Sequence, residues 1–415
     1  MRKKSVFINC MEALTANRKH NEARALLNAG LKESAQRQTA ATAPAYVPTK
    51  PYVFPAVDGN MTYHTSWGSH GVKEEAETIL SVLSSFRLRS TLAKINQGPR
   101  LTQYVIEPAP GTQVQSILRR EKEFQAALHC NASLRFDNGY VYIEVPTGTE
   151  TVFLGDMLID NAFQSSDGFT MAIGMAVDGS KHYIDIAKAC HILISGMTGS
   201  GKSIVLHNLI LSLLMKKNPA QMHLYIIDPK ATEFEYYKNL AACTVVSEVN
   251  GAVELLKNLC IEMDRRYSVL ASTGCRDIDS YNAKFADAPM RRDIVFIDEL
   301  SDLMSMGGKS FEGHIVRIAQ KARACGIHLV IATQYPVAKV VTGLIKANMP
   351  TKICLRVSTV TNSMVALDMA GGEKLMGHGD MLFLPNGSLS PVRLQGGFVS
   401  ETAINNVVAG LMKNQ

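Results

Sequence analysis

The sequence predicts an α/β fold with a mostly parallel sheet flanked by helices, preceded by a small α+β domain. Three observations predict it. Short apolar runs alternate with helical patterns in the second half of the chain, as parallel strands joined by crossover helices do. A glycine-rich motif ending in Lys-Ser stands between one such strand and one such helix. The segment before it mixes helical spacing with strand-like alternation.

Size and composition limit the class of protein. A chain of 415 residues has room for two or three domains, and 46% hydrophobic with 19% charged residues is ordinary for a globular protein. The net charge of +6 gives weak support for a polyanionic partner. No apolar run approaches the roughly 18–20 residues of a membrane span. The eight cysteines lack metal-ligand spacing. We therefore expect a cytoplasmic protein with reduced thiols and no membrane insertion.

The chain divides into three expected parts. Residues 1–58 form a basic N-terminal helix and a flexible linker rich in Ala, Thr, Pro and Gln. This part is either a simple tail or a docking arm for a protein partner, and composition leaves both open. Residues 59–165 form the small α+β domain, and residues 166–415 form the large α/β domain.

The small domain's elements follow from spacing. Ile79, Val82, Leu83 and Phe86 share one face of a helix. Two later runs alternate in polarity like half-buried strands, and a second helical pattern lies between them. In chain order the expected elements are helix Ala76–Phe86, strand Leu101–Glu107, helix Val114–Leu128 and strand Tyr140–Val145.

The large domain's elements are short apolar strands separated by longer helical patterns, which predicts a parallel sheet. The expected strands are His191–Ser195, His223–Asp228, Asp293–Asp298, Ile327–Thr333, Lys352–Val357 and Asp380–Leu384. The main expected helices are Ile204–Lys216, Ala252–Ala271 and Phe311–Ala324.

The glycine-rich motif matches G-x-x-x-x-G-K-[ST] and has the strand before it and the helix after it that a phosphate-binding loop requires. Lys202 would reach the β- and γ-phosphates, and the Ser203 hydroxyl would ligate Mg²⁺. The sequence therefore predicts a site for ATP with Mg²⁺. The expected nucleotide-binding residues are Gly196, Met197, Thr198, Gly199, Ser200, Gly201, Lys202, Ser203 and Ile204.

Two more strands end in residues suited to hydrolysis. Asp298 follows a buried strand and can hold Mg²⁺, while Glu299 can orient the attacking water. The alternative is an ordinary strand that ends in exposed acids. Gln334 ends the next strand, where its amide can sense the γ-phosphate or simply make a strand-end hydrogen bond.

Several ordered motifs together resemble the FtsK/SpoIIIE family of DNA translocases. The resemblance runs from about residue 71 to about residue 410, is most specific over Ala189–Val399, and extends more weakly to the family's smaller α domain. Besides the phosphate loop, the motifs are Leu224–Lys230, Glu262–Tyr267, Ile297–Met304, Ala319–Leu329, Ala332–Gln334, Gly343–Pro350 and Gly379–Leu382.

The resemblance implies a RecA-like motor domain in a homohexameric ring, with ATP hydrolysed at subunit boundaries and double-stranded DNA in the central pore. Arg323 matches the family position proposed for an arginine finger, although a solvated helix arginine is the plainer interpretation. We expect neither the membrane anchor of cell-division translocases nor the C-terminal winged-helix domain that reads DNA sequence.

The pore-facing segments depart from the family pattern. Tyr335, Val360 and Met364 stand where the family usually has basic residues, which weakens the expected grip on DNA. The remaining candidates for DNA contact are Lys339, Lys346, Arg356, Thr359, Thr361 and Asn362.

Three functions stay open at this point. The first is an ATP-dependent translocase of double-stranded DNA. The second is a related ring ATPase for DNA transfer or packaging. The third is a nucleotide-regulated scaffold that no longer moves DNA, which the residues at 335, 360 and 364 favour and the intact Lys202, Asp298 and Glu299 oppose.

Overall fold

The fold comes from a computed structural model that describes residues 71–146, 148 and 150–413. All of these residues belong to one compact unit. The helix and linker that we expect within residues 1–58 lie outside the described residues, as do the first residues of the smaller domain.

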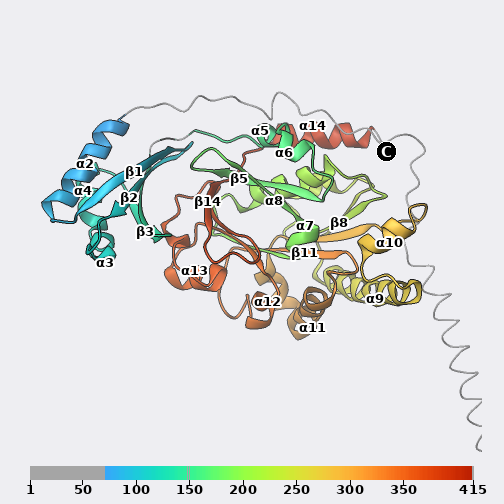
Figure 1. The fold of residues 1–415 in the computed structure, drawn as a ribbon. Coiled ribbons are helices and arrows are strands. Elements are labelled where there is room, and N and C mark those ends of the chain that lie inside the picture. The colour runs from blue at the N-terminus through green and yellow to red at the C-terminus, as the bar shows by residue number, and fades with distance from the viewer. Residues whose placement is uncertain (1–70, 147, 149, 414–415) are drawn as a thin grey trace, which may run out of the picture. The chain divides into compact units, whose positions relative to one another are not determined.

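The smaller domain is an antiparallel sheet with helices packed against it (Figure 1). In spatial order its strands are β1 (Ser90–Gln97), β2 (Leu101–Pro108), β4 (Tyr140–Pro146) and β3 (Ser133–Asp137). Its helices are α2 (Val72–Ser85), α3 (Val114–Leu118) and α4 (Glu121–Leu128). Helix α2 buries Ala76, Ile79 and Leu83 in the domain core, because this spacing places the three side chains on one face.

The large domain is built on a ten-stranded mixed sheet within the described residues. Six neighbouring strands are parallel: β12 (Thr351–Leu355), β7 (Ile192–Ser195), β11 (Ile327–Thr333), β10 (Arg292–Ile297), β8 (Met222–Ile227) and β9 (Cys243–Val246). Beyond β12 the sheet continues antiparallel through β13 (Asp380–Leu384), β14 (Val392–Gln395), β5 (Thr170–Ala176) and β6 (Lys181–Asp185). The expected mostly parallel sheet is confirmed.

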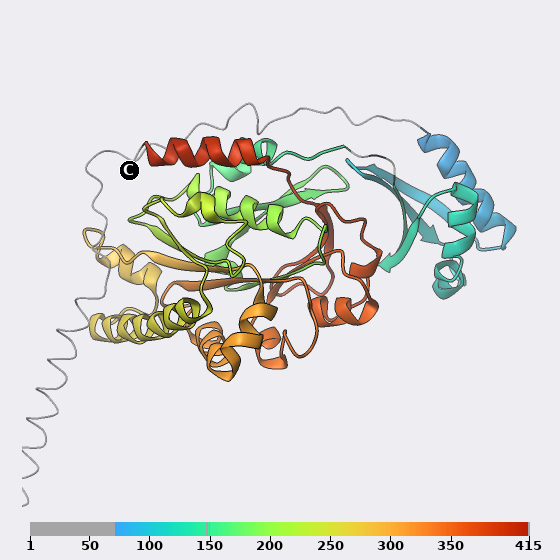
Figure 2. The ribbon, with the colours of Figure 1, turned by 180° about the vertical axis from the view of Figure 1, so that it is seen from behind.

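Helices cover both faces of this sheet. Helices α8 (Lys202–Leu214) and α14 (Glu401–Met412) contribute to one apolar core, and α9 (Val249–Thr273) and α11 (Leu300–Lys321) to another. Figure 2 shows these two pairs on opposite sides of the strands. The shorter helices are α5 (Leu154–Leu158), α6 (Asn161–Gln164), α7 (Ile186–Ala189), α10 (Ile278–Lys284), α12 (Gly343–Ala347) and α13 (Val360–Leu367), with 3₁₀ turns at Glu235–Tyr237 and Gly372–Lys374.

Two expected helices differ from the observed ones. The helix expected at Phe311–Ala324 begins much earlier, at Leu300, and contains a non-helical residue, Gly308, at φ 58° and ψ −150°. The glycine pair at 307–308 made the first half look like a loop, although Leu300 and Leu303 are buried in the core and hold it in place. The pattern at Val114–Leu128 forms α3 and α4, which are separated by two residues.

The junction between the domains also lies earlier than the expected boundary at residues 165/166. Val152, Leu154 and Phe163 are fully buried in the same core as α8, so this stretch packs with the large domain. The last strand of the smaller domain, β4, ends at Pro146. Because these side chains are buried against the large sheet, the stretch from Val152 to Phe163 belongs to the large domain.

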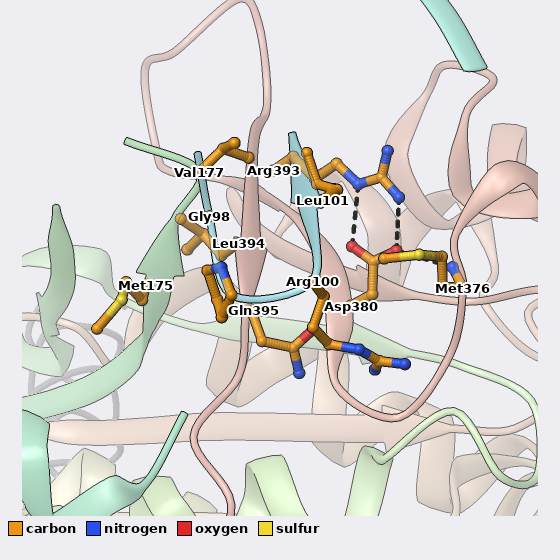
Figure 3. Close-up of a pocket in the computed structure, with 11 residues that line it drawn as sticks. Gly98, Arg100, Leu101, Met175, Val177, Met376, Asp380, Arg393, Leu394 and Gln395 are labelled. Carbon is orange, nitrogen blue, oxygen red and sulfur yellow. Dashed lines mark hydrogen bonds and ion pairs between the residues drawn. The ribbon is translucent and has the colours of Figure 1, made fainter. Parts of the chain in front are cut away.

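A buried ion-pair network joins the two domains. The Arg393 guanidinium on β14 makes two hydrogen bonds to the Asp380 carboxylate, at 3.0 and 2.7 Å (Figure 3). It also pairs with Glu144 on β4 of the smaller domain. Burial opposes the charge on Glu144, but Arg393 and Arg135 hold the pKa of this carboxyl below its usual range.

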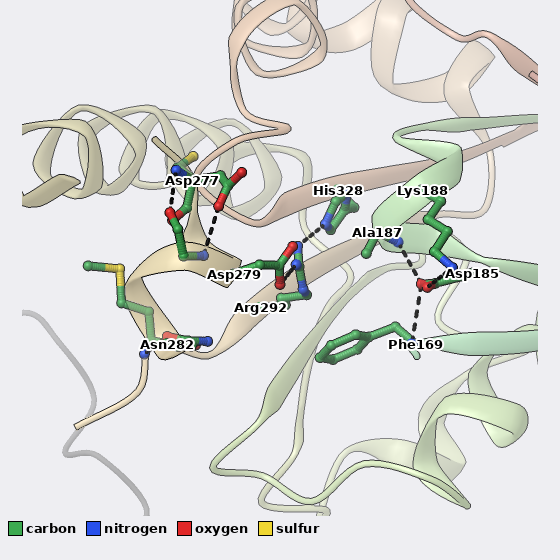
Figure 4. A network of polar contacts seen from close by, with 12 residues as sticks. Phe169, Asp185, Ala187, Lys188, Asp277, Asp279, Asn282, Arg292 and His328 are labelled. Atoms are coloured by element: carbon green, nitrogen blue, oxygen red, sulfur yellow. Dashed lines mark hydrogen bonds and ion pairs between the residues drawn. The ribbon is translucent and has the colours of Figure 1, made fainter. Parts of the chain in front are cut away.

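A second polar network lies at the amino ends of the parallel strands (Figure 4). The Arg292 guanidinium donates to Asp279 on α10 at 2.5 Å and contacts Nε2 of His328 on β11 at 3.1 Å. His328 Nδ1 in turn lies 2.9 Å from the Cys190 carbonyl oxygen, so the network fastens the start of β7 to its neighbours. This edge is opposite the one where the strands end.

No helix in the described part of the chain is long and apolar enough to cross a membrane. The cysteines at positions 130, 190, 243, 260, 275, 325 and 354 are free thiols. Cys10 lies outside the described residues.

Candidate nucleotide-binding site

The phosphate loop spans Gly196–Ser203 and connects β7 to α8 at the carboxyl edge of the parallel sheet. Gly199 and Gly201 have φ values of +79° and +98°, a left-handed conformation that side chains rarely adopt. At Gly201 an added Cβ would also lie 2.6 Å from the backbone nitrogen of Gly379. The loop shape therefore needs glycine at both positions.

Amide groups of this loop are free to bind an anion. Among the described residues, no hydrogen bond takes up the N–H groups of Gly199, Gly201 and Lys202. They stand at the amino end of α8, where the helix dipole favours negative charge. Unpaired donors at a helix start and the glycine backbone fit the phosphates of a nucleotide.

Lys202 is buried and engaged with the end of β10. Its Nζ donates to the Asp298 carboxylate at 2.6 Å and to the Asp298 carbonyl oxygen at 2.7 Å. Burial raises the pKa of Asp298, and the neighbouring Lys202 charge opposes that rise. A phosphate that binds the Lys202 ammonium must therefore compete with Asp298 for it.

Glu299 is also buried, at the amino end of α11. Its carboxylate accepts hydrogen bonds from the Thr333 hydroxyl at 2.8 Å and from the Gln334 amide N–H at 3.0 Å. The Ser301 hydroxyl donates a third, at 2.8 Å. The side chain that we expect to orient water is thus held by the end of β11.

Gln334 links the phosphate loop to this acid pair. Strand β11 lies between β7 and β10, so its last residues stand between the loop and Glu299. The Gln334 side-chain oxygen accepts a hydrogen bond from the Thr198 hydroxyl at 2.9 Å. Sheet order explains why residues far apart in sequence meet here, at the edge where open α/β sheets bind ligands.

The structure adds one acidic residue that sequence reasoning missed. Glu233 lies near Ser203, and burial together with the charges of Asp298 and Asp228 raises its pKa. The buried Asp228 carboxylate positions this turn by accepting the N–H groups of Thr232 and Glu233 at 3.1 Å each. The Asp-Pro-Lys motif after β8 was the available signal.

The donor set fits Mg²⁺. The Ser203 hydroxyl and the carboxylates of Asp298 and Glu233 are oxygen ligands of the kind that Mg²⁺ prefers. Their negative charge exceeds what Lys202 alone can balance. No group of three or more His, Cys, Asp or Glu side chains is placed to hold a metal within the described residues. A Mg²⁺ that shares its ligands with phosphates and water does not need such a group.

Arg323 lies away from this site. It is exposed in the turn between α11 and β11, at the amino ends of the strands, and not on the helix itself. Its charge acts on Cys190 and His191, which immediately precede β7, whereas the phosphate loop follows β7. The sheet separates Arg323 from the phosphate loop of its own chain.

The expected DNA contacts occupy different settings. Arg356 lies beside the phosphate loop, because its carbonyl oxygen accepts the Met197 N–H at 2.8 Å. The Lys346 ammonium is paired with Asp368 at 2.6 Å. Lys339 is exposed, and no ion pair among the described residues engages it.

The threonines and the asparagine surround the start of α13. Thr359 caps this helix by accepting the Asn362 N–H at 3.1 Å, and the Asn362 side chain donates to the Pro336 carbonyl at 3.2 Å. Thr361 is exposed. The hydrogen bond from Asn362 to Pro336 brings segments 335–342 and 358–364 together in one surface. Tyr335, Val360 and Met364 are 62%, 51% and 46% exposed there.

Two family models match the chain. The model described as FtsK/SpoIIIE family matches residues 154–338. The model described as FtsK alpha domain matches residues 59–147, a match that ends at the close of β4. Together they cover the smaller domain and the phosphate loop, acid pair and glutamine described above.

Curated relatives are similar over most of this chain. The DNA translocase SftA of Bacillus subtilis is 39% identical over 377 residues, covering 86% of this chain and 39% of the relative. The DNA translocase FtsK of Caldanaerobacter subterraneus is 40% identical over 351 residues, covering 82% of this chain and 49% of the relative. The chain spans less than half the length of these two relatives.

Solved structures share the fold. The pCW3 conjugation coupling protein TcpA, in its monomer form with ATPγS, has a TM-score of 0.58 and 25% identity, and the match covers 82% of this chain and 99% of that one. The type VII secretion ATPase EccC of Thermomonospora curvata has a TM-score of 0.56 at 23% identity, covering 63% of this chain and 34% of that one.

Proposed function

Because the chain belongs to the FtsK/SpoIIIE family, we propose that it hydrolyses ATP to move along double-stranded DNA, as part of a ring of identical chains. The observation that carries the proposal is the junction of three strand ends. There the Lys202 ammonium binds Asp298, the residue before Glu299. The backbone N–H of Gln334 donates to Glu299, and its side chain accepts from Thr198 of the phosphate loop. A site that only bound nucleotide would not need Glu299 beside it.

The residues have separate tasks in the proposed reaction. The loop amides and the Lys202 ammonium bind the phosphates, and Ser203 and Asp298 hold Mg²⁺. Bound Mg²⁺ would supply positive charge to the phosphate oxygens. Glu299 orients a water and takes its proton as the water oxygen attacks the γ-phosphorus and the bond to the bridging oxygen of ADP breaks. Gln334 responds to the γ-phosphate through its contact with Thr198.

A ring supplies what one chain lacks. Phosphoryl transfer is accelerated strongly by an arginine near the transferring group. Arg323 stands at the opposite edge of the sheet from its own phosphate loop, so it can serve only the site of a neighbouring chain. We therefore infer hydrolysis at the boundaries between subunits.

DNA as the substrate rests on the relatives, which are named DNA translocases. The surface formed by segments 335–342 and 358–364 is the proposed contact, with Lys339 as its exposed cation and Thr361 as an uncharged hydrogen-bond partner. Phosphate contacts of this kind supply affinity without sequence preference.

One observation favours a second candidate. The same surface exposes Tyr335, Val360 and Met364, which suit apolar contact with a protein better than contact with phosphates. The second candidate is an ATPase that drives a protein partner. The fold is also similar to that of a conjugation coupling protein, which supports DNA transfer as one possible task of the first candidate.

The test is the steady-state ATPase rate with and without linear duplex DNA, at low and moderate salt, beside Lys202→Ala. Strong stimulation by DNA that is absent in the variant supports the DNA motor, and displacement of a triplex strand then tests movement. A rate that depends on Lys202 but ignores DNA at every salt concentration contradicts the motor and favours the second candidate.

A further inference from the structure

The turn that carries Arg323 has a fully bonded backbone. It spans residues 322–326 and joins α11 to β11. Every carbonyl oxygen from Lys321 to Gly326 accepts a hydrogen bond. One of these bonds closes the turn on itself, because the Gly326 N–H donates to the Arg323 carbonyl oxygen at 3.2 Å. The backbone at Arg323 is therefore held in one position.

Two of the other hydrogen bonds come from side chains of α9. The Tyr267 hydroxyl donates to the Lys321 carbonyl oxygen. The Arg266 guanidinium donates to the Cys325 carbonyl oxygen at 2.9 Å. Both side chains belong to the motif Glu262–Tyr267, which has no part in the nucleotide site. This motif therefore binds the 322–326 turn on both sides of its arginine.

Arg266 is itself fixed in the interior. The residue is 3% exposed, and its guanidinium donates to Glu262 at 2.8 Å and to Asp293 at 2.5 Å. The two carboxylates balance its buried charge. Asp293 also holds the end of the turn, since its backbone N–H donates to the Gly326 carbonyl oxygen at 2.9 Å. Helix α9, strand β10 and the turn thus share one network.

Helix α10 gives the turn a third support. The Ile278 N–H donates to the Ala324 carbonyl oxygen at 2.8 Å. Figure 4 shows Asp277 and Asp279 at the start of this helix. Asp277 caps the helix, and Asp279 accepts a hydrogen bond from Arg292 on β10 at 2.5 Å. The support is therefore anchored to the same strand as Arg266.

The Arg323 side chain contrasts with this backbone. It is exposed, and its guanidinium makes no hydrogen bond or ion pair within the part of the chain that the structure describes. A free guanidinium on a fixed backbone needs only its own torsions ordered when it meets a ligand. Such an arrangement suits a group that must reach a site outside its own chain.

We propose that Arg266 and Tyr267 are positioning residues for Arg323. They hold the 322–326 turn in the place from which Arg323 reaches the phosphate loop of a neighbouring chain. The inference rests on the proposed function, in which Arg323 acts on that neighbour. Because neither residue lies in the nucleotide site of its own chain, their loss should lower kcat and leave the KM for ATP nearly unchanged. A displacement of about 1 Å at a catalytic group can cost about 10²-fold in rate.

The first variant is Tyr267→Phe, which removes the hydroxyl that binds Lys321 and leaves the ring in place. The steady-state ATPase of the full chain should show kcat lower by about tenfold and KM within about twofold of the wild type. Tyr281→Phe is the matched control. Tyr281 packs in the same apolar core as Tyr267, but its hydroxyl makes no hydrogen bond to any described residue, so kcat should not change.

The second variant is Arg266→Lys. The lysine keeps a positive charge for Glu262 and Asp293, but one ammonium cannot replace a planar guanidinium that bonds three separate partners. We expect kcat to fall by about tenfold, again with KM nearly unchanged. Thermal unfolding shows that each variant is folded at the assay temperature. Arg266→Ala is avoided, because it would leave a buried carboxylate without its cation.

The decisive measurement repeats both substitutions in an Arg323→Ala background. If the two residues act through Arg323, neither substitution should change the remaining kcat by more than about twofold. A variant that lowers kcat only when Arg323 is present supports the inference for its residue. An equal loss in both backgrounds would show a general structural role and would overturn the inference, as would an unchanged kcat in both single variants.

Arg323→Ala alone separates failure of this inference from failure of the proposed function. We expect it to lower kcat by at least about 10³-fold. If it does so while Tyr267→Phe and Arg266→Lys do not act through it, the shared site stands and only the positioning role falls. If Arg323→Ala hydrolyses ATP as fast as the wild type, or if the wild type hydrolyses none, the proposed function falls and the inference falls with it.

Discussion

Single residues in the site are held in place by hydrogen bonds to one another. The Lys202 ammonium is bound by two oxygens of Asp298, and Glu299 accepts hydrogen bonds from four donors on Ser301, Thr333 and Gln334. Each group is thereby fixed in place at the edge of the sheet. The same bonds must partly exchange when phosphates and water enter, so binding and catalysis can be separated by substitutions at different residues.

Glu299→Gln should separate ATP binding from ATP hydrolysis. The amide keeps an oxygen for Thr333 and Gln334 but cannot take a proton from water, so the ATPase rate is expected to fall by about 10²–10⁴. The dissociation constant for ATP should stay within about twofold of the wild type. Glu254→Gln, on the exposed surface of α9, is the control. A variant that hydrolyses ATP normally would remove Glu299 from the mechanism.

Buried histidines make stability depend on pH. Burial lowers the pKa of His191 to about 4, and its Nδ1 accepts the Leu329 N–H at 3.0 Å. In the unfolded chain the pKa of this histidine is near 6.5. Between about pH 4 and 6.5 the unfolded chain therefore binds a proton at His191 that the folded chain does not bind. The stabilising contribution is complete above about pH 6.5 and is lost as pH falls toward 4.

We expect the free energy of unfolding in urea to fall by about 2 kcal/mol between pH 7.5 and 5.0 on account of His191 alone. His191→Asn keeps an acceptor for Leu329 and does not titrate, so its unfolding free energy should fall less over the same interval. An equal fall in both proteins would show that His191 is not responsible.

At the scale of elements, the connection between β7 and α8 carries the site, and its glycines have unequal roles. Gly199 and Gly201 share the left-handed conformation. An added Cβ meets nothing within 4 Å at Gly199 but lies 2.6 Å from the Gly379 nitrogen at Gly201. The two positions therefore separate backbone strain from a collision with a neighbouring turn.

Gly199→Ala should cost about 1–2 kcal/mol of unfolding free energy, the penalty of the left-handed conformation. Gly201→Ala should cost more and also weaken ATP binding at least tenfold, because the phosphate loop must shift away from Gly379. Urea unfolding and nucleotide titration on both variants make the comparison. Equal losses of unfolding free energy and of ATP affinity in the two variants would mean that the turn at Gly379 moves away from the added methyl group at no cost in free energy.

The same elements show what the sequence could and could not predict. Residues Gly196–Ser203, Asp298 and Gln334 were predictable because strand ends and loop glycines leave local signals. Arg100 gave none, because its hydrogen bonds to the Gly377 and His378 carbonyls depend on the approach of the smaller domain. Strand β1 mixes polar and apolar residues without regular alternation and was missed for that reason.

At the scale of the whole molecule, the sheet divides the proposed catalytic groups between its two edges. The phosphate loop, the acid pair and Gln334 follow their strands, and Arg323 precedes β11. From Ile192 to Ser195 the backbone of β7 spans roughly 10 Å at about 3.3 Å per residue. A complete site in the proposed ring therefore needs two chains.

Mixing two inactive variants should restore hydrolysis. Arg323→Ala is expected to bind ATP normally and to lose most of its ATPase rate, and Lys202→Ala to lose binding. In mixed rings, an Arg323→Ala subunit supplies an intact phosphate loop, and a neighbouring Lys202→Ala subunit supplies an intact Arg323. Arg317→Ala, whose guanidinium pairs with Asp264 on the exposed surface, is the control for loss of a surface arginine. A mixture as inactive as its components would contradict the shared site.

In the proposed ring, the position of Arg323 also makes turnover depend on the concentration of the chain. A single chain would hold two unmatched halves of the proposed catalytic centre, one at each edge of its sheet. Turnover per chain would then rise steeply with concentration at low dose and level off once neighbours are always present. A cell could silence such a motor by dilution alone, without an inhibitor and without losing a single folded molecule.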